Sequence, residues 1–118
     1  MVRILLLFES LTFVTAALIH FGLLIDGYVH RRAGTAEAVV AVVLAAGLIV
    51  TWSPSWAHRG SMVAQAFAIL GVSVGLFTIA VGVGPQTALD IAYHVAILAV
   101  LILGLAISAR LPRGGTSD

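Results

Sequence analysis

Four long apolar segments dominate the sequence and decide what it can fold into. They cover residues 4–25, 35–52, 61–83 and 88–109. A helix needs roughly 17–25 mostly apolar residues to cross the hydrocarbon core of a bilayer, and each segment has that length. The segments are continuously apolar rather than alternating, which argues against the strands of a transmembrane β-barrel. The sequence therefore predicts an all-α fold, an integral membrane four-helix bundle with up-down topology.

Composition supports lipid as the solvent. Hydrophobic residues make up 61% of the 118 residues and charged residues 9%, whereas an average soluble domain is about 25% charged. The net charge of +1 provides no basic face for nucleic acid, so the expected partner is the bilayer. The chain has no Cys, which excludes disulfides, iron–sulfur clusters and thiolate metal sites.

Turn residues separate the apolar segments. Asp26-Gly27 follows the first segment, Ser53-Pro54 follows the second, and Gly84-Pro85 lies between the third and the fourth. Proline cannot extend a helix and disfavours helical backbone at the residue before it. We therefore predict one four-helix domain over residues 1–110, with a polar, disordered cytoplasmic tail at 111–118.

Arginine placement predicts the orientation. Cytoplasmic loops of membrane proteins carry an excess of cations. Four arginines fall at one end of the predicted bundle and two at the other. This puts both termini and the middle loop in the cytoplasm, with the protein in a bacterial inner membrane, and Trp52 and Trp56 fit that interface as aromatic anchors. The four are Arg3, Arg59, Arg110 and Arg113, and the two are Arg31 and Arg32.

Small residues form a stripe along the third segment. They recur at helical spacing and include a GxxxG pattern, through which membrane helices approach one another closely. This face predicts tight helix packing, within the bundle, in a homo-oligomer or in a larger membrane complex. Its members are Ala64, Ala68, Gly71, Gly75, Thr78 and Gly82.

Glu9 and His20 are ionisable groups within the first segment. Glu9 interrupts the apolar run, which favours a retained first helix over a signal peptide. The two residues are eleven positions apart, three turns plus about 20°, so they share a helix face and form a candidate proton path. The alternative for Glu9 is structural: a protonated carboxyl, or one bonded to Ser10, Thr12 or Gln65.

His20 and His94 lie at similar depths on segments that run antiparallel. They are about 7.5 and 6 Å to the outer side of their helix centres, so we expect the two rings to meet inside the bundle. Such a pair is a candidate site for haem b or for a transition metal, with Asp90 as a third metal ligand. The competing interpretation of Asp90 is a capping box with Thr87. The competing interpretation of the histidines is a plain interhelical hydrogen bond.

Other polar residues are expected at the two surfaces and need no function. Glu37 fits the dipole at the start of its helix, and His58 and Arg59 fit a solvated cytoplasmic loop. The remaining members of the outer cluster are Asp26, His30, Arg31 and Arg32.

Two stretches resemble a known group of proteins. Residues 8–13 with 17–22, and residues 75–85, are similar to uncharacterised small bacterial membrane proteins with four spans. That resemblance implies the fold and the membrane location but no activity. The chain length and the acidic residue in the first segment also resemble small multidrug transporters, but the aromatics of their substrate chamber have no counterpart here.

The sequence favours a role without enzymatic activity. It leaves three functions open. The first is an accessory or structural bundle that packs with a partner or with itself. The second is a redox protein that holds haem or a metal at His20 and His94. The third is a proton-coupled transporter or permeation subunit that uses Glu9 and His20.

Overall fold

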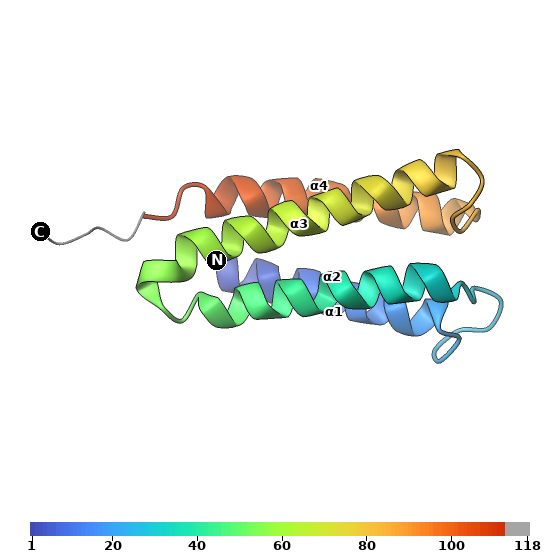
Figure 1. The fold of residues 1–118 in the computed structure, drawn as a ribbon, viewed down its shortest axis with the longest axis horizontal. Helices are drawn as coiled ribbons and strands as arrows, with labels where there is room; N and C mark the ends of the chain where they lie inside the picture. Colours follow the sequence, from blue (N-terminus) through green and yellow to red (C-terminus); the bar gives the residue numbers. More distant parts are fainter. Residues whose placement is uncertain (113–118) are drawn as a thin grey trace, which may run out of the picture.

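The computed structural model describes residues 1–112 and contains four helices in that range. They are α1 (Val2–His20), α2 (Arg31–Val50), α3 (Pro54–Ala80) and α4 (Ala88–Ser108). Each helix is long and apolar enough to cross a membrane. The all-helical prediction is therefore confirmed (Figure 1). The predicted tail at 111–118 lies outside the described residues from position 113 onward.

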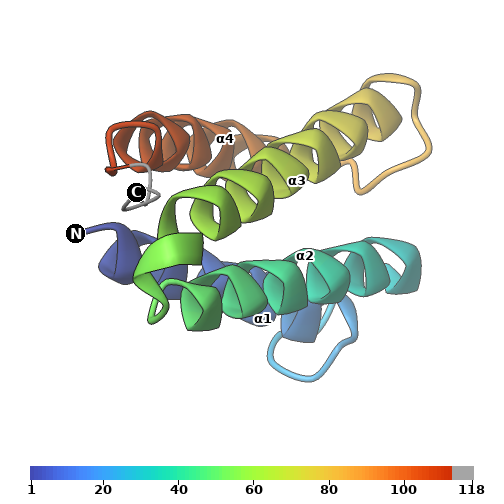
Figure 2. The ribbon, with the colours of Figure 1, turned by 60° about the vertical axis from the view of Figure 1, so that its left-hand side comes forward.

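The helices form two layers, each an antiparallel pair. α1 and α2 make one layer, and α3 and α4 lie on it, with α3 running obliquely over α2 (Figures 1 and 2). Each helix contacts the next along the chain, and α1 also contacts α4. The first and last helices are therefore neighbours, which closes the bundle. The N-terminus and the α2–α3 turn lie at one end, which we call the inner end. The α1–α2 and α3–α4 connections lie at the other, the outer end (Figure 1).

Glycines set the outer ends of α1 and α3. Gly22 and Gly82 adopt φ angles of 77° and 79°, a left-handed conformation that other residues rarely take. The residue after each glycine donates its N–H to the carbonyl five residues earlier at 2.9 Å, the pattern of a Schellman cap. Consequently α1 stops at His20 rather than near residue 25. Gly82 is a cap residue, not part of the predicted packing face, and a Cβ there would meet nothing within 4 Å.

α2 and α3 begin several residues earlier than predicted. Pro54 occupies the first turn of α3, where its missing N–H costs nothing, so the helix starts seven residues before the predicted position 61. His58 and Arg59 are therefore helical rather than in a loop. α2 begins at Arg31, because the His30 ring caps it by accepting a hydrogen bond from the Ala33 N–H at 3.2 Å.

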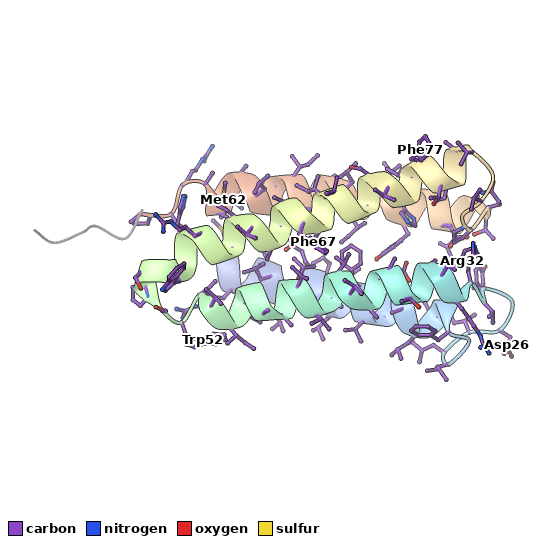
Figure 3. All side chains as sticks on the ribbon, in the orientation of Figure 1. Asp26, Arg32, Trp52, Met62, Phe67 and Phe77 are labelled. Atoms are coloured by element: carbon purple, nitrogen blue, oxygen red, sulfur yellow. The ribbon has the colours of Figure 1, made fainter. Side chains whose placement is uncertain are left out.

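Apolar side chains fill the interior and also cover the outside. Val42, Ile49 and Phe77 are 69%, 68% and 65% exposed, and Figure 3 shows Phe77 directed away from the bundle. The buried cluster draws on all four helices. It comprises Val2, Leu6, Phe13, Val40, Ala41, Leu44, Ala64, Ala68, Val72, Ile97 and Leu101.

α2 and α3 cross most closely near the inner end. A Cβ added at Gly47 would overlap the Cβ of Ala64, and one added at Gly60 would lie 2.5 Å from Val50 Cγ1. Nearby, the Arg3 guanidinium of α1 donates to the Thr51 carbonyl at 2.9 Å. A cation at a helix C-terminus is favourable, so this contact stabilises the inner end of the α1–α2 pair.

Candidate functional site

A buried cluster of His20, Glu37 and Asp90 joins three helices near the outer end. His20 Nδ1 lies 2.7 Å from Glu37 Oε2, and Nε2 lies 3.1 Å from Asp90 Oδ1. The three residues are 3%, 6% and 6% exposed. Because ionised carboxylates only accept hydrogen bonds, an imidazolium that donates from both nitrogens fits this arrangement. The His20 ring, at the end of α1, thus contacts both α2 and α4.

Asp90 has two roles, one for each carboxylate oxygen. Its Oδ2 accepts from the Thr87 N–H at 3.2 Å and from the Thr87 hydroxyl. The Asp90 N–H in turn donates to the Thr87 hydroxyl at 3.1 Å. The capping box predicted from the sequence is therefore confirmed. The other oxygen, Oδ1, remains available for His20, so the start of α4 holds the carboxylate in place for the cluster.

Glu37 is the member of the cluster with unused hydrogen-bonding capacity. Its Oε1 is buried and has no hydrogen-bond partner within residues 1–112. The Tyr93 hydroxyl is also buried without a partner in that range. Buried polar atoms without partners are rare, and each one needs an explanation such as a bound water, ion or ligand. For Glu37, a partner of that kind would have to lie in the space beside its carboxylate.

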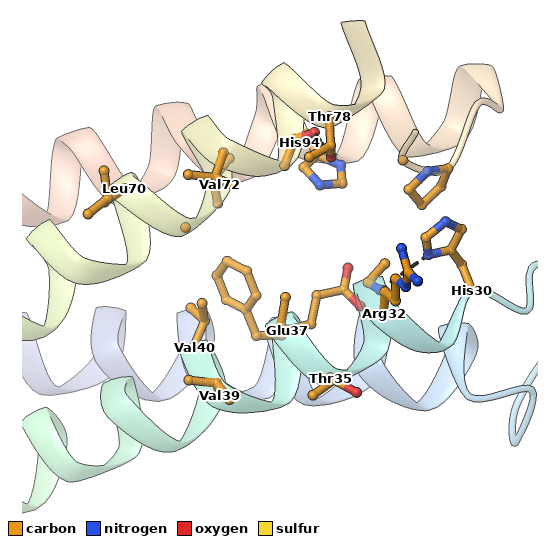
Figure 4. A pocket seen from close by; sticks show the side chains of 18 of the residues that line it. His30, Arg32, Thr35, Glu37, Val39, Val40, Leu70, Val72, Thr78 and His94 are labelled. Carbon is orange, nitrogen blue, oxygen red and sulfur yellow. Dashed lines mark hydrogen bonds between the residues drawn. The ribbon is translucent and has the colours of Figure 1, made fainter. Parts of the chain in front are cut away.

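A cavity of about 720 Å³ lies between α2 and α3 at the outer end of the bundle. Ligand pockets typically have volumes of about 300–1,000 Å³. Glu37 reaches it from α2 and His94 from α4, while Arg32 and His30 line its outermost part (Figure 4). The rest of the wall is mainly apolar. It includes Phe13, Val39, Val40, Phe67, Leu70, Val72 and Val74.

His94 presents a hydrogen-bond acceptor to this cavity. Its Nδ1 lies 2.7 Å from the Asp90 carbonyl oxygen, which can only accept, so Nδ1 carries a proton. In a neutral ring the other nitrogen, Nε2, is then unprotonated. Nε2 faces Gly75, where an added Cβ would lie 2.9 Å from it. Because Gly75 has no side chain, the ring fits against α3 at this point.

A second polar network lies toward the inner end. Glu9 is fully buried, and its two oxygens accept from Gln65 Nε2 at 3.3 and 3.2 Å. The Ser108 hydroxyl donates to Gln65 Oε1 at 2.6 Å, and His58 Nδ1 lies 3.1 Å from the Ser108 carbonyl. Gly104 makes room for this network, because a Cβ there would overlap Gln65 and Glu9. Glu9 thus faces the interior and pairs with Gln65, one of the three partners named by its structural alternative.

The two polar networks are not joined. No hydrogen bond connects Glu9 to His20 in the part of the chain that the structure describes. Between their levels lie buried apolar side chains, among them Phe13, Ala68 and Ile97. Eleven residues also place Glu9 and His20 about 16 Å apart along the helix. The proposed proton path would need a further carrier across this apolar layer.

The small-residue stripe of α3 is split between two environments. Ala64 and Ala68 are 2% and 0% exposed in the core. Gly71, Gly75 and Thr78 instead line the cavity. The inner half of the predicted packing face lies in the core. Its outer half lines the cavity and also lies against other helices, because a Cβ added at Gly71 would be 3.0 Å from Val40 Cγ2 and one at Gly75 would be 2.9 Å from His94 Nε2.

His20 and His94 both belong to this site but are not hydrogen-bonded to each other within residues 1–112. Both nitrogens of His20 already have carboxylate partners, so it would have to give up one of them to hold a haem iron. Among the described residues, no group of three or more His, Cys, Asp or Glu has a geometry suited to a metal ion. The two histidines are linked through Asp90 instead. The Asp90 side chain contacts His20, and its backbone carbonyl contacts His94.

Glu37 is the member of the candidate site that the sequence interpretation misses. The sequence predicts it at the outer surface, but it is buried and central to the cluster. The available signal is periodicity: Gly34, Glu37, Val40, Ala41 and Leu44 are all buried on one face of α2.

Comparison with protein-family models, with curated proteins and with solved structures finds no match to this chain. The function has to be inferred from the site itself.

Proposed function

We propose that this chain is a multi-pass membrane protein that binds a small lipophilic molecule in the cavity between α2 and α3. One observation carries the proposal. Glu37 Oε1 is a buried acceptor without a partner among residues 1–112, and Glu37 forms part of a largely apolar cavity wall. Sites for small molecules combine mostly hydrophobic walls with a few fixed polar groups, and Glu37 and His94 are such groups.

Access from the bilayer follows from the exposed part of the wall. Val39, Leu70 and Val74 line the cavity and are 50%, 63% and 54% exposed. In a membrane these side chains would contact acyl chains. A molecule dissolved in the hydrocarbon could then enter sideways between α2 and α3, without crossing the polar surface.

The other candidate functions account for less of the geometry. A purely structural bundle needs no cavity and gains nothing from an unpaired buried carboxylate oxygen, which costs free energy. A haem or metal at His20 would have to displace Glu37 or Asp90. Proton transfer from Glu9 to His20 meets the apolar layer between them. Binding at the cavity uses the arrangement as it stands.

Photolabelling of the full chain in lipid nanodiscs tests this function. A small lipophilic diazirine, adamantane diazirine, should label cavity residues such as Phe67 with a saturable dependence on its concentration. Labelling of side chains that face lipid, such as Val42, should rise in proportion to concentration. Non-saturable labelling of Phe67 would refute the proposal.

A matched pair of variants assigns the labelling to the cavity. Gly75→Leu places a bulky side chain against His94 and into the cavity, so the saturable component should disappear. Ala66→Leu makes a similar change at an exposed position of the same helix and should leave labelling intact. Equal loss in both variants would show that the effect does not arise in the cavity.

A further inference from the structure

With Glu37 ionised, the polar groups of Glu37, His94 and Thr78 on the cavity wall offer only hydrogen-bond acceptors. Glu37 Oε1 is a carboxylate oxygen without a partner in the described range. His94 Nε2 is unprotonated in the neutral ring, because Nδ1 donates to the Asp90 carbonyl. The Thr78 hydroxyl donates its only hydrogen to the Gly75 carbonyl at 2.8 Å, so it too can only accept. A ligand that satisfies this site has to supply the donors.

The charge of the cluster also favours a ligand that supplies hydrogen-bond donors. With Glu37 and Asp90 ionised on either side of a His20 imidazolium, the form that matches the two contacts, the buried cluster carries one net negative charge. A buried charge is costly unless it is paired. Arg32 and His30 are the other titratable groups on the cavity wall. His30 is engaged as the cap of α2 and with the Val83 carbonyl. Arg32 forms no ion pair with Glu37 among residues 1–112.

Arg32 also lies farther out than Glu37. Five residues of α2 separate them, about 7.5 Å along the helix, and an Arg near a helix end can extend its head group toward the membrane surface. Figure 4 shows Arg32 and His30 near the start of α2 and Glu37 deeper in the cavity, on the side of His94. The negative charge at the inner part of the cavity is therefore left for a ligand to balance.

We propose that the cavity binds a lipophilic amine in its protonated form, with ammonium hydrogens donated to Glu37 Oε1 and His94 Nε2. The inference rests on the proposed function and adds the chemical class of the ligand. The apolar body of the amine packs against the cavity wall, in contact with Phe67 and Leu70. A neutral lipophile would fill the same volume but leave the negative charge unbalanced, and an anion would be repelled by it.

Three probes with one apolar body separate these ligand classes. 1-Aminoadamantane, 1-adamantanol and adamantane-1-carboxylate are titrated at neutral pH against the full chain in nanodiscs, with empty nanodiscs as the correction for lipid partitioning. Binding is followed by saturation-transfer NMR. A hydrogen bond between charged groups in a buried site should favour the amine over the alcohol by at least about tenfold in Kd. The carboxylate should bind most weakly.

Two matched variants locate the effect. Glu37→Gln keeps the shape but removes the charge and should bring the ratio of amine to alcohol affinity close to one. Glu9→Gln makes the same change at the other buried glutamate, outside the cavity, and should leave that ratio unchanged. His94→Leu keeps the His20 cluster whole and should weaken amine binding several-fold. It provides the test if Glu37→Gln does not fold, as judged by circular dichroism.

The outcomes distinguish the ligand class from the function. If the alcohol or the carboxylate binds as tightly as the amine, or if the folded Glu37 and His94 variants keep the amine preference, the amine assignment is wrong and the lipophilic site remains. If none of the three probes binds saturably, both the ligand class and the proposed function are overturned.

Discussion

His20 links three helices through one ring. Its nitrogens contact a carboxylate from α2 and another from α4, and these contacts lie where α1 ends in its glycine cap. Buried ion pairs contribute little net free energy compared with apolar replacements, but removing one partner leaves an uncompensated charge. The cluster therefore places Glu37 beside the cavity more than it adds to overall stability.

Replacing His20 alone should be strongly destabilising. In His20→Leu, Glu37 and Asp90 remain buried without their shared cation, and we expect a loss of roughly 3–5 kcal/mol in the free energy of unfolding. Titration with a denaturing detergent, followed by circular dichroism, measures it. The double variant His20→Leu/Glu37→Leu should recover a substantial part of the loss. Additive effects of the two substitutions would show that the contact contributes nothing.

For single residues, local hydrogen-bonding motifs can be predicted from the sequence more readily than the burial of a side chain. The capping box of Asp90 with Thr87 is predictable because it depends on local spacing within one helix. The sequence names Gln65 only as one of three possible partners of Glu9, because that contact joins α1 to α3. The burial of Glu37 is not predictable in this way, because it depends on how α2 rotates against α1. That rotation is fixed by side chains distant in the sequence, and only the spacing of buried positions along α2 hints at it.

At the scale of the helices, α2 and α3 meet tightly at one end and leave space at the other. Gly47 and Gly60 allow the close approach at the inner end. Toward the outer end α3 runs obliquely away from α2 (Figure 2), and the cavity occupies that region. The cavity thus lies between the same two helices, on the outer side of their close crossing.

A bulky residue at the crossing should disrupt this arrangement. Gly47→Leu has no room beside Ala64, so we expect α2 and α3 to be forced apart and the free energy of unfolding to fall by roughly 1–3 kcal/mol or more. Ala46→Leu, at the neighbouring exposed position, is the control and should change little. Both are measured by the same detergent titration. Equal stability of the two variants would mean that the helices do not cross at Gly47.

Helix boundaries are the least predictable feature at this scale. The apolar run continues from His20 to Ile25, so hydropathy alone extends the first helix beyond its real end. The chain turns at Gly22 because a left-handed glycine closes the Schellman cap. In the other direction, the sequence suggests a stop signal at Pro54, although this proline starts α3. Proline fits either role, and only the helical pattern of the residues after it identifies it as a helix start.

At the scale of the whole molecule, apolar side chains cover the outer surface of all four helices. Exposed large hydrophobic side chains occur on every helix, which a water-soluble bundle would bury or replace with polar ones. Polar side chains gather toward the two ends. Figure 3 shows Asp26 and Arg32 at the outer end and Trp52 at the inner end. We infer from this distribution that the bundle spans the membrane with its long axis across the bilayer.

Cations at the inner end favour a cytoplasmic location for both termini. Arg3, Arg59 and Arg110 belong to that end, and Arg113, the fourth arginine of the sequence prediction, lies outside the described residues. Fusions of alkaline phosphatase and of green fluorescent protein test the topology, since the first is active only outside the cytoplasm and the second fluoresces only within it. A fusion after Arg110 should fluoresce and lack phosphatase activity. A fusion after Asp26, in the α1–α2 connection, should give the opposite pair of signals. Phosphatase activity after Arg110 would reverse the orientation, and equal signals at both positions would contradict a bundle that crosses the membrane.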